Sequence, residues 1–113
     1  MGRRMKYFRF HDEEQEKSHY LELSGLEVGE QEMDNLFYSV IRPEMENRNL
    51  EERYGVHDVS FNGVADTIWG FTTYEVEYDK WFELMQEWRQ ILTLAGFNVG
   101  AYFCMIEDEE HEL

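Results

Sequence analysis

The first quarter of the chain alternates between apolar and polar positions. Residues 6–10 and residues 20–24 both show a period of two, with Leu21 and Leu23 on one face of the second segment. This period is typical of a half-buried strand, because successive side chains of a strand point to opposite faces. An acidic stretch separates the two segments, so the sequence predicts a hairpin closed by an acidic loop.

The next segment has the period of a helix. Apolar residues between positions 33 and 41 recur at the spacing of one helix face, and acidic residues precede them. Pro43 lacks a backbone N–H and cannot continue a helix normally, so we expect this helix to end near Arg42. Residues 44–54 are polar with few apolar anchors, and the sequence predicts for them a short second helix closed by Gly55.

A second hairpin is predicted around Asn62-Gly63. The flanking segments, residues 56–61 and 64–71, are rich in β-branched and aromatic side chains. Asn-Gly between two such segments is the strongest short-range signal for a two-residue type I′ turn. We therefore expect Asn62 and Gly63 to form the turn of this hairpin.

The last third of the chain holds the longest predicted helix and a final strand. Residues 79–95 carry a broad apolar stripe, with Asp79 as the expected N-cap and Gly96 as the expected C-terminal cap. Residues 99–106 then alternate, but the side chains of both sets are largely apolar. A strand that is hydrophobic on both faces is typical of the centre of a sheet, and we expect it there.

These elements predict one small α+β domain. Their order along the chain is ββα(α)ββαβ, which indicates a mainly antiparallel sheet with two main helices packed on one face. A chain of 113 residues has the size of a single domain. We place this domain at residues 1–106 and treat residues 107–113 as an acidic C-terminal tail.

Charge is the unusual feature of the composition. The chain has 25 acidic and 10 basic residues, a net charge of -15, and 16 of the acids lie outside the first acidic loop and the C-terminal tail. Their mutual repulsion disfavours a compact fold. Such a field repels the phosphates of nucleic acids and anionic membranes, and it attracts basic proteins. We therefore expect a basic protein as the partner, and no direct binding to nucleic acids or membranes.

Rows of carboxylates are the candidate binding residues. Asp79, Glu83 and Glu87 recur at i, i+4 and i+8, which places them along one face of the predicted last helix. Like charges at this spacing repel by about 0.2 to 0.5 kcal/mol per pair, so the row weakens the helix. The candidate partner-binding residues are Glu75, Glu77, Asp79, Glu83 and Glu87, followed by Asp12, Glu13, Glu14 and Glu16 of the acidic loop.

In composition, the chain is similar to small acidic nucleic-acid mimics, such as anti-restriction and anti-CRISPR proteins, and to acidic immunity proteins that neutralise nucleases. This similarity implies a non-enzymatic inhibitor that occupies the basic surface of a nucleic-acid-binding protein or nuclease. Three alternatives stay open. The acids serve solubility alone, a pocket between sheet and helices makes the protein a small ligand-binding domain or enzyme, or the protein is a structural oligomer, such as a homodimer, that pairs through its last strand or a sheet edge.

Other residues give no sign of catalysis, a metal or a cofactor. Cys104 is the only cysteine, which excludes an intramolecular disulfide, and no histidine lies near it in the sequence. Residues 58–66 resemble the first nine positions of a calcium loop, but Trp69 stands where a bidentate glutamate is required. No apolar stretch is long enough to cross a membrane. We expect no catalytic residue, metal or cofactor, and a cytoplasmic location, in the host cytoplasm if the protein is viral.

Overall fold

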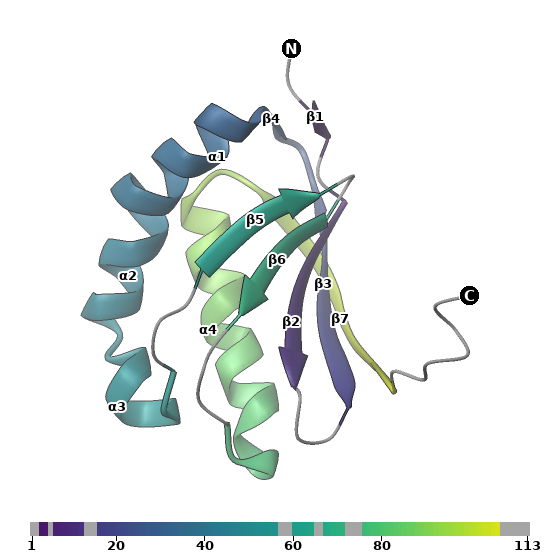
Figure 1. Ribbon diagram of the computed structural model, residues 1–113, viewed down its shortest axis with the longest axis vertical. Helices are drawn as coiled ribbons and strands as arrows, with labels where there is room; N and C mark the ends of the chain where they lie inside the picture. The colour runs from purple at the N-terminus through teal and green to yellow at the C-terminus, as the bar shows by residue number, and fades with distance from the viewer. Residues whose placement is uncertain are drawn as a thin grey trace.

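The computed structural model describes residues 3–4, 6–12, 16–56, 60–64, 67–71 and 76–106 (Figure 1). The strands are β1 (Arg3–Arg4), β2 (Tyr7–Asp12), β3 (Lys17–Ser24), β4 (Glu27–Val28), β5 (Ser60–Val64), β6 (Thr67–Phe71) and β7 (Asn98–Ile106). The helices are α1 (Glu30–Leu36), α2 (Arg42–Asn47), α3 (Leu50–Tyr54) and α4 (Trp81–Leu94), with a π-helical turn at Phe37–Ile41 and a 3₁₀ turn at Tyr78–Lys80.

Five strands form the main sheet, in the order β5-β6-β2-β3-β7. Neighbouring strands pair antiparallel, except that β2 and β6 run parallel. Strands β1 and β4 form a separate antiparallel pair. Figure 1 shows α1, α2 and α3 along the side of the molecule next to β5, while β7 borders the opposite side. The predicted α+β domain, with a mainly antiparallel sheet and two main helices on one face, is confirmed.

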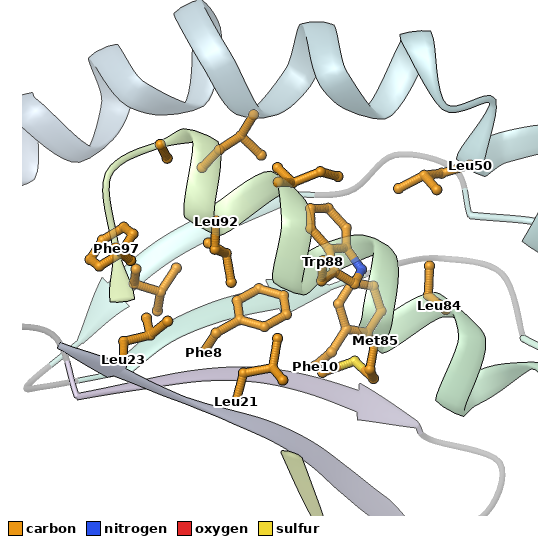
Figure 2. Packing of buried hydrophobic residues seen from close by; sticks show 14 of the residues in the cluster. Phe8, Phe10, Leu21, Leu23, Leu50, Leu84, Met85, Trp88, Leu92 and Phe97 are labelled. Carbon is orange, nitrogen blue, oxygen red and sulfur yellow. The ribbon is translucent and has the colours of Figure 1, made fainter. Parts of the chain in front are cut away.

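The hydrophobic core lies between the sheet and α4. Phe8 and Phe10 of β2 are fully buried, and their ring centroids lie 5.3 and 5.8 Å from that of Trp88. Leu21 and Leu23 of β3 are buried on the same side, which confirms the alternation predicted for both strands. Figure 2 shows Trp88 of α4 packed among these side chains. Large aromatic side chains contribute much of the packing energy of such a core, and the indole of Trp88 contacts both phenylalanines of β2.

Helix α4 has the longest apolar stripe, as predicted. It ends in a Schellman motif, in which the N–H groups of Gly96 and Phe97 donate to the carbonyl oxygens of Thr93 and Leu92. Gly96 has a φ of +113°, a value that glycine adopts without strain. The expectation that Asp79 caps the start of α4 is wrong, because Asp79 lies in the preceding 3₁₀ turn. The buried stripe consists of Trp81, Leu84, Met85, Trp88, Ile91 and Leu92.

The first predicted helix does not end near Arg42. Its chain makes a π-helical turn, in which the N–H of Arg42 donates to the carbonyl oxygen of Phe37, and α2 follows directly. Pro43 lies in the first turn of α2, directly after the π-helical turn. The break comes later, at Asn49, which has a φ of +53°, and Gly55 closes α3 as predicted. The prediction that Pro43 ends the helix is therefore wrong, because a π-helical turn precedes the proline and the chain stays helical through it.

The second hairpin exists, but Asn62 and Gly63 do not form its turn. Both residues lie inside β5, where Asn62 pairs with Trp69 and Gly63 with Ile68. Val64 pairs with Thr67, so the connection consists of residues 65 and 66, which lie outside the described residues. The prediction of a turn at Asn62-Gly63 is wrong because β5 and β6 stay paired through both residues and up to Val64.

Strand β7 lies at the edge of the sheet, and its predicted central position is wrong. Its two apolar faces have two different partners. On the helix-covered face, Tyr102 contacts Phe82 of α4, with ring centroids 5.8 Å apart. On the other face, Phe103 stacks on Tyr20 of β3 at 4.9 Å. A strand can thus be apolar on both faces without having a neighbouring strand on both sides.

Candidate functional site

The acidic residues are distributed unevenly between the two layers of the fold. The helical layer, residues 30–56 and 76–94, holds eleven acidic and five basic side chains. The five strands of the main sheet hold two acidic and two basic side chains. Uneven charge of this kind produces a field with a direction, which steers a charged partner toward one side of a protein. The candidate site is therefore the helical layer.

Three of the predicted carboxylates are exposed at the start of α4. Glu77 directly precedes the 3₁₀ turn before the helix and Asp79 lies in it, and both are exposed. The side chain of Glu83 is 55% exposed and forms only a long ion pair with Lys80, at 3.8 Å. An ion pair between two exposed side chains contributes little binding energy, so it leaves Glu83 accessible to a partner.

Glu87 belongs to the same predicted row but has a different environment. Its two carboxylate oxygens lie 3.2 Å from Arg48 and 3.4 Å from Arg53, and its side chain is only 16% exposed. Arg48 also forms an ion pair with Glu44 at 3.1 Å and donates to Gln90 at 2.6 Å. These contacts connect α4 to α2 and α3, so Glu87 stabilises the helical layer rather than presenting a free charge.

The acidic loop that ranked second among the candidates is only partly described. Asp12 is 5% exposed, because it lies at the end of β2 on the helix-covered side of the sheet. Glu16 is exposed and has a φ of +53°. Glu13, Glu14 and Glu75 lie outside the described residues. Of the predicted residues, Glu77, Asp79 and Glu83 thus lie in consecutive turns at the start of α4, whereas Asp12 is buried.

Sequence reasoning missed a cluster around His19. His19 lies directly opposite Cys104 in the pairing of β3 with β7, and its Nδ1 lies 2.8 Å from the hydroxyl of Tyr102. Its ring stacks on Trp81, with centroids 4.0 Å apart. His19, Leu21 and Leu23 occupy alternate positions of one predicted strand, and this spacing places the histidine on the core face of β3. Finding Cys104 beside it required the register of two distant strands.

Burial keeps this cluster uncharged at neutral pH. It lowers the pKa of His19 to about 4, an effect that the charge of Asp12 only partly offsets. Burial raises the pKa of Tyr102 to about 12 and also raises the pKa of the Cys104 thiol. Because the reactive form of cysteine is the thiolate, a raised pKa disfavours nucleophilic chemistry at Cys104. Within the described residues, no group of three or more His, Cys, Asp or Glu side chains is arranged to hold a metal.

The sheet face opposite the helices is aromatic. Tyr7 lies 6.2 Å from both Tyr20 and Phe103 in edge-to-face geometry. Arg9 lies on the same face, where it donates to Ser18 at 2.7 Å and its guanidinium lies 5.9 Å from the ring of Tyr20. This face therefore combines packed rings with a cation that is already bonded within the sheet.

No protein-family model, curated protein or solved structure matches this chain. No helix among the described residues is long and apolar enough to span a membrane. The functional argument therefore depends on the fold and on its charges.

Proposed function

We propose that this protein is a non-enzymatic inhibitor that binds the basic, nucleic-acid-binding surface of a partner protein. The observation that carries the proposal is the excess of acidic over basic side chains in the helical layer, eleven against five, while the five strands of the main sheet are balanced. Acids that serve only solubility need no preferred side, since solubility depends on the total charge. The contrast between an acidic helical layer and a balanced sheet favours recognition.

The exposed carboxylates at the start of α4 are the proposed contacts. A groove that binds nucleic acid holds phosphates through lysine and arginine side chains. Glu77, Asp79 and Glu83 offer such side chains the same charge-assisted hydrogen bonds, and the bulk of the domain then blocks the groove. Association would be fast and sensitive to salt, because the long-range field of the helical layer steers the encounter.

The test begins with capture of partners from a lysate by the immobilised protein at low and high salt. Retained proteins are identified by mass spectrometry, and DNA or RNA is added as a competitor. The proposal expects a basic nucleic-acid-binding protein that is released both by salt and by nucleic acid. Failure of nucleic acid to compete with the retained protein would contradict the proposal.

Matched charge variants then locate the contact on the identified partner. Asp79→Lys combined with Glu83→Lys changes the charge of the helical layer, and Glu22→Lys combined with Glu27→Lys makes the same total change at two exposed positions outside it. We expect the first pair to weaken binding by at least about tenfold and the second pair to weaken it much less. Equal loss in both double variants would mean that only the total charge matters.

A further inference from the structure

Phe82 is a large aromatic side chain that the fold leaves on the surface. It is 63% exposed, and its ring centroid lies 5.8 Å from that of Tyr102 in edge-to-face geometry. Arg89, two turns further along α4, donates to the carbonyl oxygens of Val99 and Gly100 at 3.2 and 2.6 Å, so this flank of the helix faces β7. Helices α2 and α3 lie on the other flank (Figure 1). Tyr102 therefore supports the ring of Phe82 while most of that ring stays accessible.

The surface beside Phe82 is also apolar. Tyr102, Cys104 and Ile106 share one face of β7, because successive side chains of a strand alternate between its faces. Cys104 is exposed, and Ile106 is 69% exposed. Single exposed apolar residues are normal on a protein surface, whereas a group of them marks an interaction site. We call this group, Phe82, Tyr102, Cys104 and Ile106, the Phe82 patch.

Negative charge borders the Phe82 patch. Asp79 lies three residues before Phe82 on the same side of the helix, Glu83 follows it directly, and both are exposed. Five of the six residues that follow β7 in the sequence are acidic. Lys80 pairs with Glu83 at 3.8 Å and Lys17 lies at the end of β3 beside β7, so the balance stays negative. This border repels a second copy of the chain and an anionic membrane, and it selects a basic partner.

Tyr38 provides the contrast within the helical layer. It is 65% exposed, and it lies on the π-helical turn with its ring centroid 5.1 Å from that of Phe37. Asp34 lies four residues before it and Arg42 four residues after it, so opposite charges flank its ring. Phe82 thus differs from Tyr38 in combining an exposed ring with neighbouring charges of one sign.

We propose that the Phe82 patch binds a partner protein whose ligand is single-stranded nucleic acid, with the ring of Phe82 in the place of a base. This inference rests on the proposed inhibitor function. Proteins that bind single strands combine a positive groove with aromatic side chains on which bases stack. Phe82 offers such a side chain a ring, while Asp79 and Glu83 offer the groove the negative charges that phosphates provide.

The exposed ring distinguishes the two classes of nucleic acid. A duplex holds its bases inside the stack, so a protein meets its phosphates and the edges of its bases. A mimic of a duplex therefore needs negative charge but no exposed ring. A mimic of a single strand needs both, and the Phe82 patch supplies both.

Two tripeptides of equal charge test the role of the ring directly. Lys-Trp-Lys carries an aromatic side chain between two bases, and Lys-Ala-Lys lacks it. Each peptide is titrated into the isotope-labelled protein, and the NMR shifts of the backbone amides give the dissociation constant and the place of binding. We expect Lys-Trp-Lys to bind about fivefold more tightly, with the largest shifts at Phe82 and Tyr102, because stacking of rings adds to the attraction of charges that both peptides share.

Phe82→Ala and Tyr38→Ala are the matched variants, since each removes an exposed ring and keeps every charge. Phe82→Ala should abolish the difference between the two peptides, and Tyr38→Ala should retain it. Equal binding of the two peptides to the natural protein, including no binding of either, would overturn the proposal, as would a preference that survives in Phe82→Ala. A natural protein of twice the chain mass in size exclusion with light scattering, which Phe82→Ala returns to the monomer mass, would assign the patch to a second copy and also overturn it.

The partner captured from the lysate separates this inference from the function on which it rests. A single-stranded oligonucleotide should release that partner at a lower phosphate concentration than the duplex of the same sequence. Phe82→Ala should weaken the binding of the partner about fivefold, and Tyr38→Ala should leave it unchanged. Release by the duplex at an equal or lower concentration would overturn this inference and leave the inhibitor function standing. A partner that neither nucleic acid releases would contradict the inhibitor function itself, and this inference with it.

Discussion

The helical layer and the main sheet are built on one core but differ sharply in charge. Eleven acids and five bases lie in the helical layer, against two of each in the five strands. The core does not require this difference, since the buried side chains of α4 are apolar, as are Phe8 and Phe10 of β2, and Asp12 is the only acid among the buried residues that the structure describes. The excess charge of the helical layer is therefore a property of its surface, and repulsion within it is tolerated rather than used for folding.

The same comparison shows that acids of one predicted site have three different roles. Glu83 is exposed, Glu87 is held by two arginines, and Asp12 is 5% exposed at the end of β2. A count of carboxylates in the sequence does not separate these roles. Only the first kind is free to contact a partner without loss of internal contacts.

Removal of the indole that joins the two layers should have the largest effect. Trp88→Ala leaves a cavity between β2 and α4, where the ring is fully buried beside Phe8 and Phe10. We expect the free energy of unfolding to fall by about 3 to 5 kcal/mol, the usual cost of such a truncation. Chemical denaturation measures this loss. Phe82→Ala, at a position that is 63% exposed, is the control and should cost far less; equal losses would mean that the layers do not share this core.

Lowering the pH should reduce the free energy of unfolding through protonation of His19. Its pKa is about 4 in the folded protein and 6.5 in the unfolded chain, so the unfolded chain binds the proton first as the pH falls. The contribution to stability is complete above pH 6.5 and is lost as the pH falls toward 4, by about 3 kcal/mol in total.

His19→Gln isolates this contribution from the titration of the carboxylates. Glutamine retains a polar group for the Tyr102 hydroxyl but does not titrate. We expect the difference in unfolding free energy between the natural protein and the variant to change by about 3 kcal/mol between pH 7 and pH 4, measured by urea denaturation at each pH. A difference that stays constant with pH would show that His19 is not buried in its neutral form.

Local patterns predicted most of the fold because the core is periodic. The alternation around Phe8 and Leu21 and the stripe on α4 follow directly from which positions are buried. The errors came where several short-range signals competed or where long-range pairing decided the outcome. Asn62-Gly63 is a turn sequence that the pairing of β5 with β6 overrides, and the edge position of β7 depends on strand order.

The candidate site was predicted less well than the fold. Helical spacing placed Asp79, Glu83 and Glu87 near one another, but only the packing of α2 and α3 against α4 shows that arginines hold Glu87. In the same way, His19 and Cys104 are far apart in the sequence and become neighbours through strand register alone. Contacts between distant segments carry no local signal, so charge patterns indicate a surface but not the state of each of its residues.

The smallest expected effect separates two acids of the same helix. Glu87→Gln removes the charge that Arg48 and Arg53 share, at 3.2 and 3.4 Å, and should lower the free energy of unfolding by about 1 kcal/mol, since all three side chains retain some exposure to solvent. Glu83→Gln removes only the long pair with Lys80, so the expected change is close to zero. Urea denaturation at low and high salt measures both. Salt should reduce the Glu87→Gln effect by screening, and equal effects of the two variants would mean that Glu87 is as free as Glu83 to contact a partner.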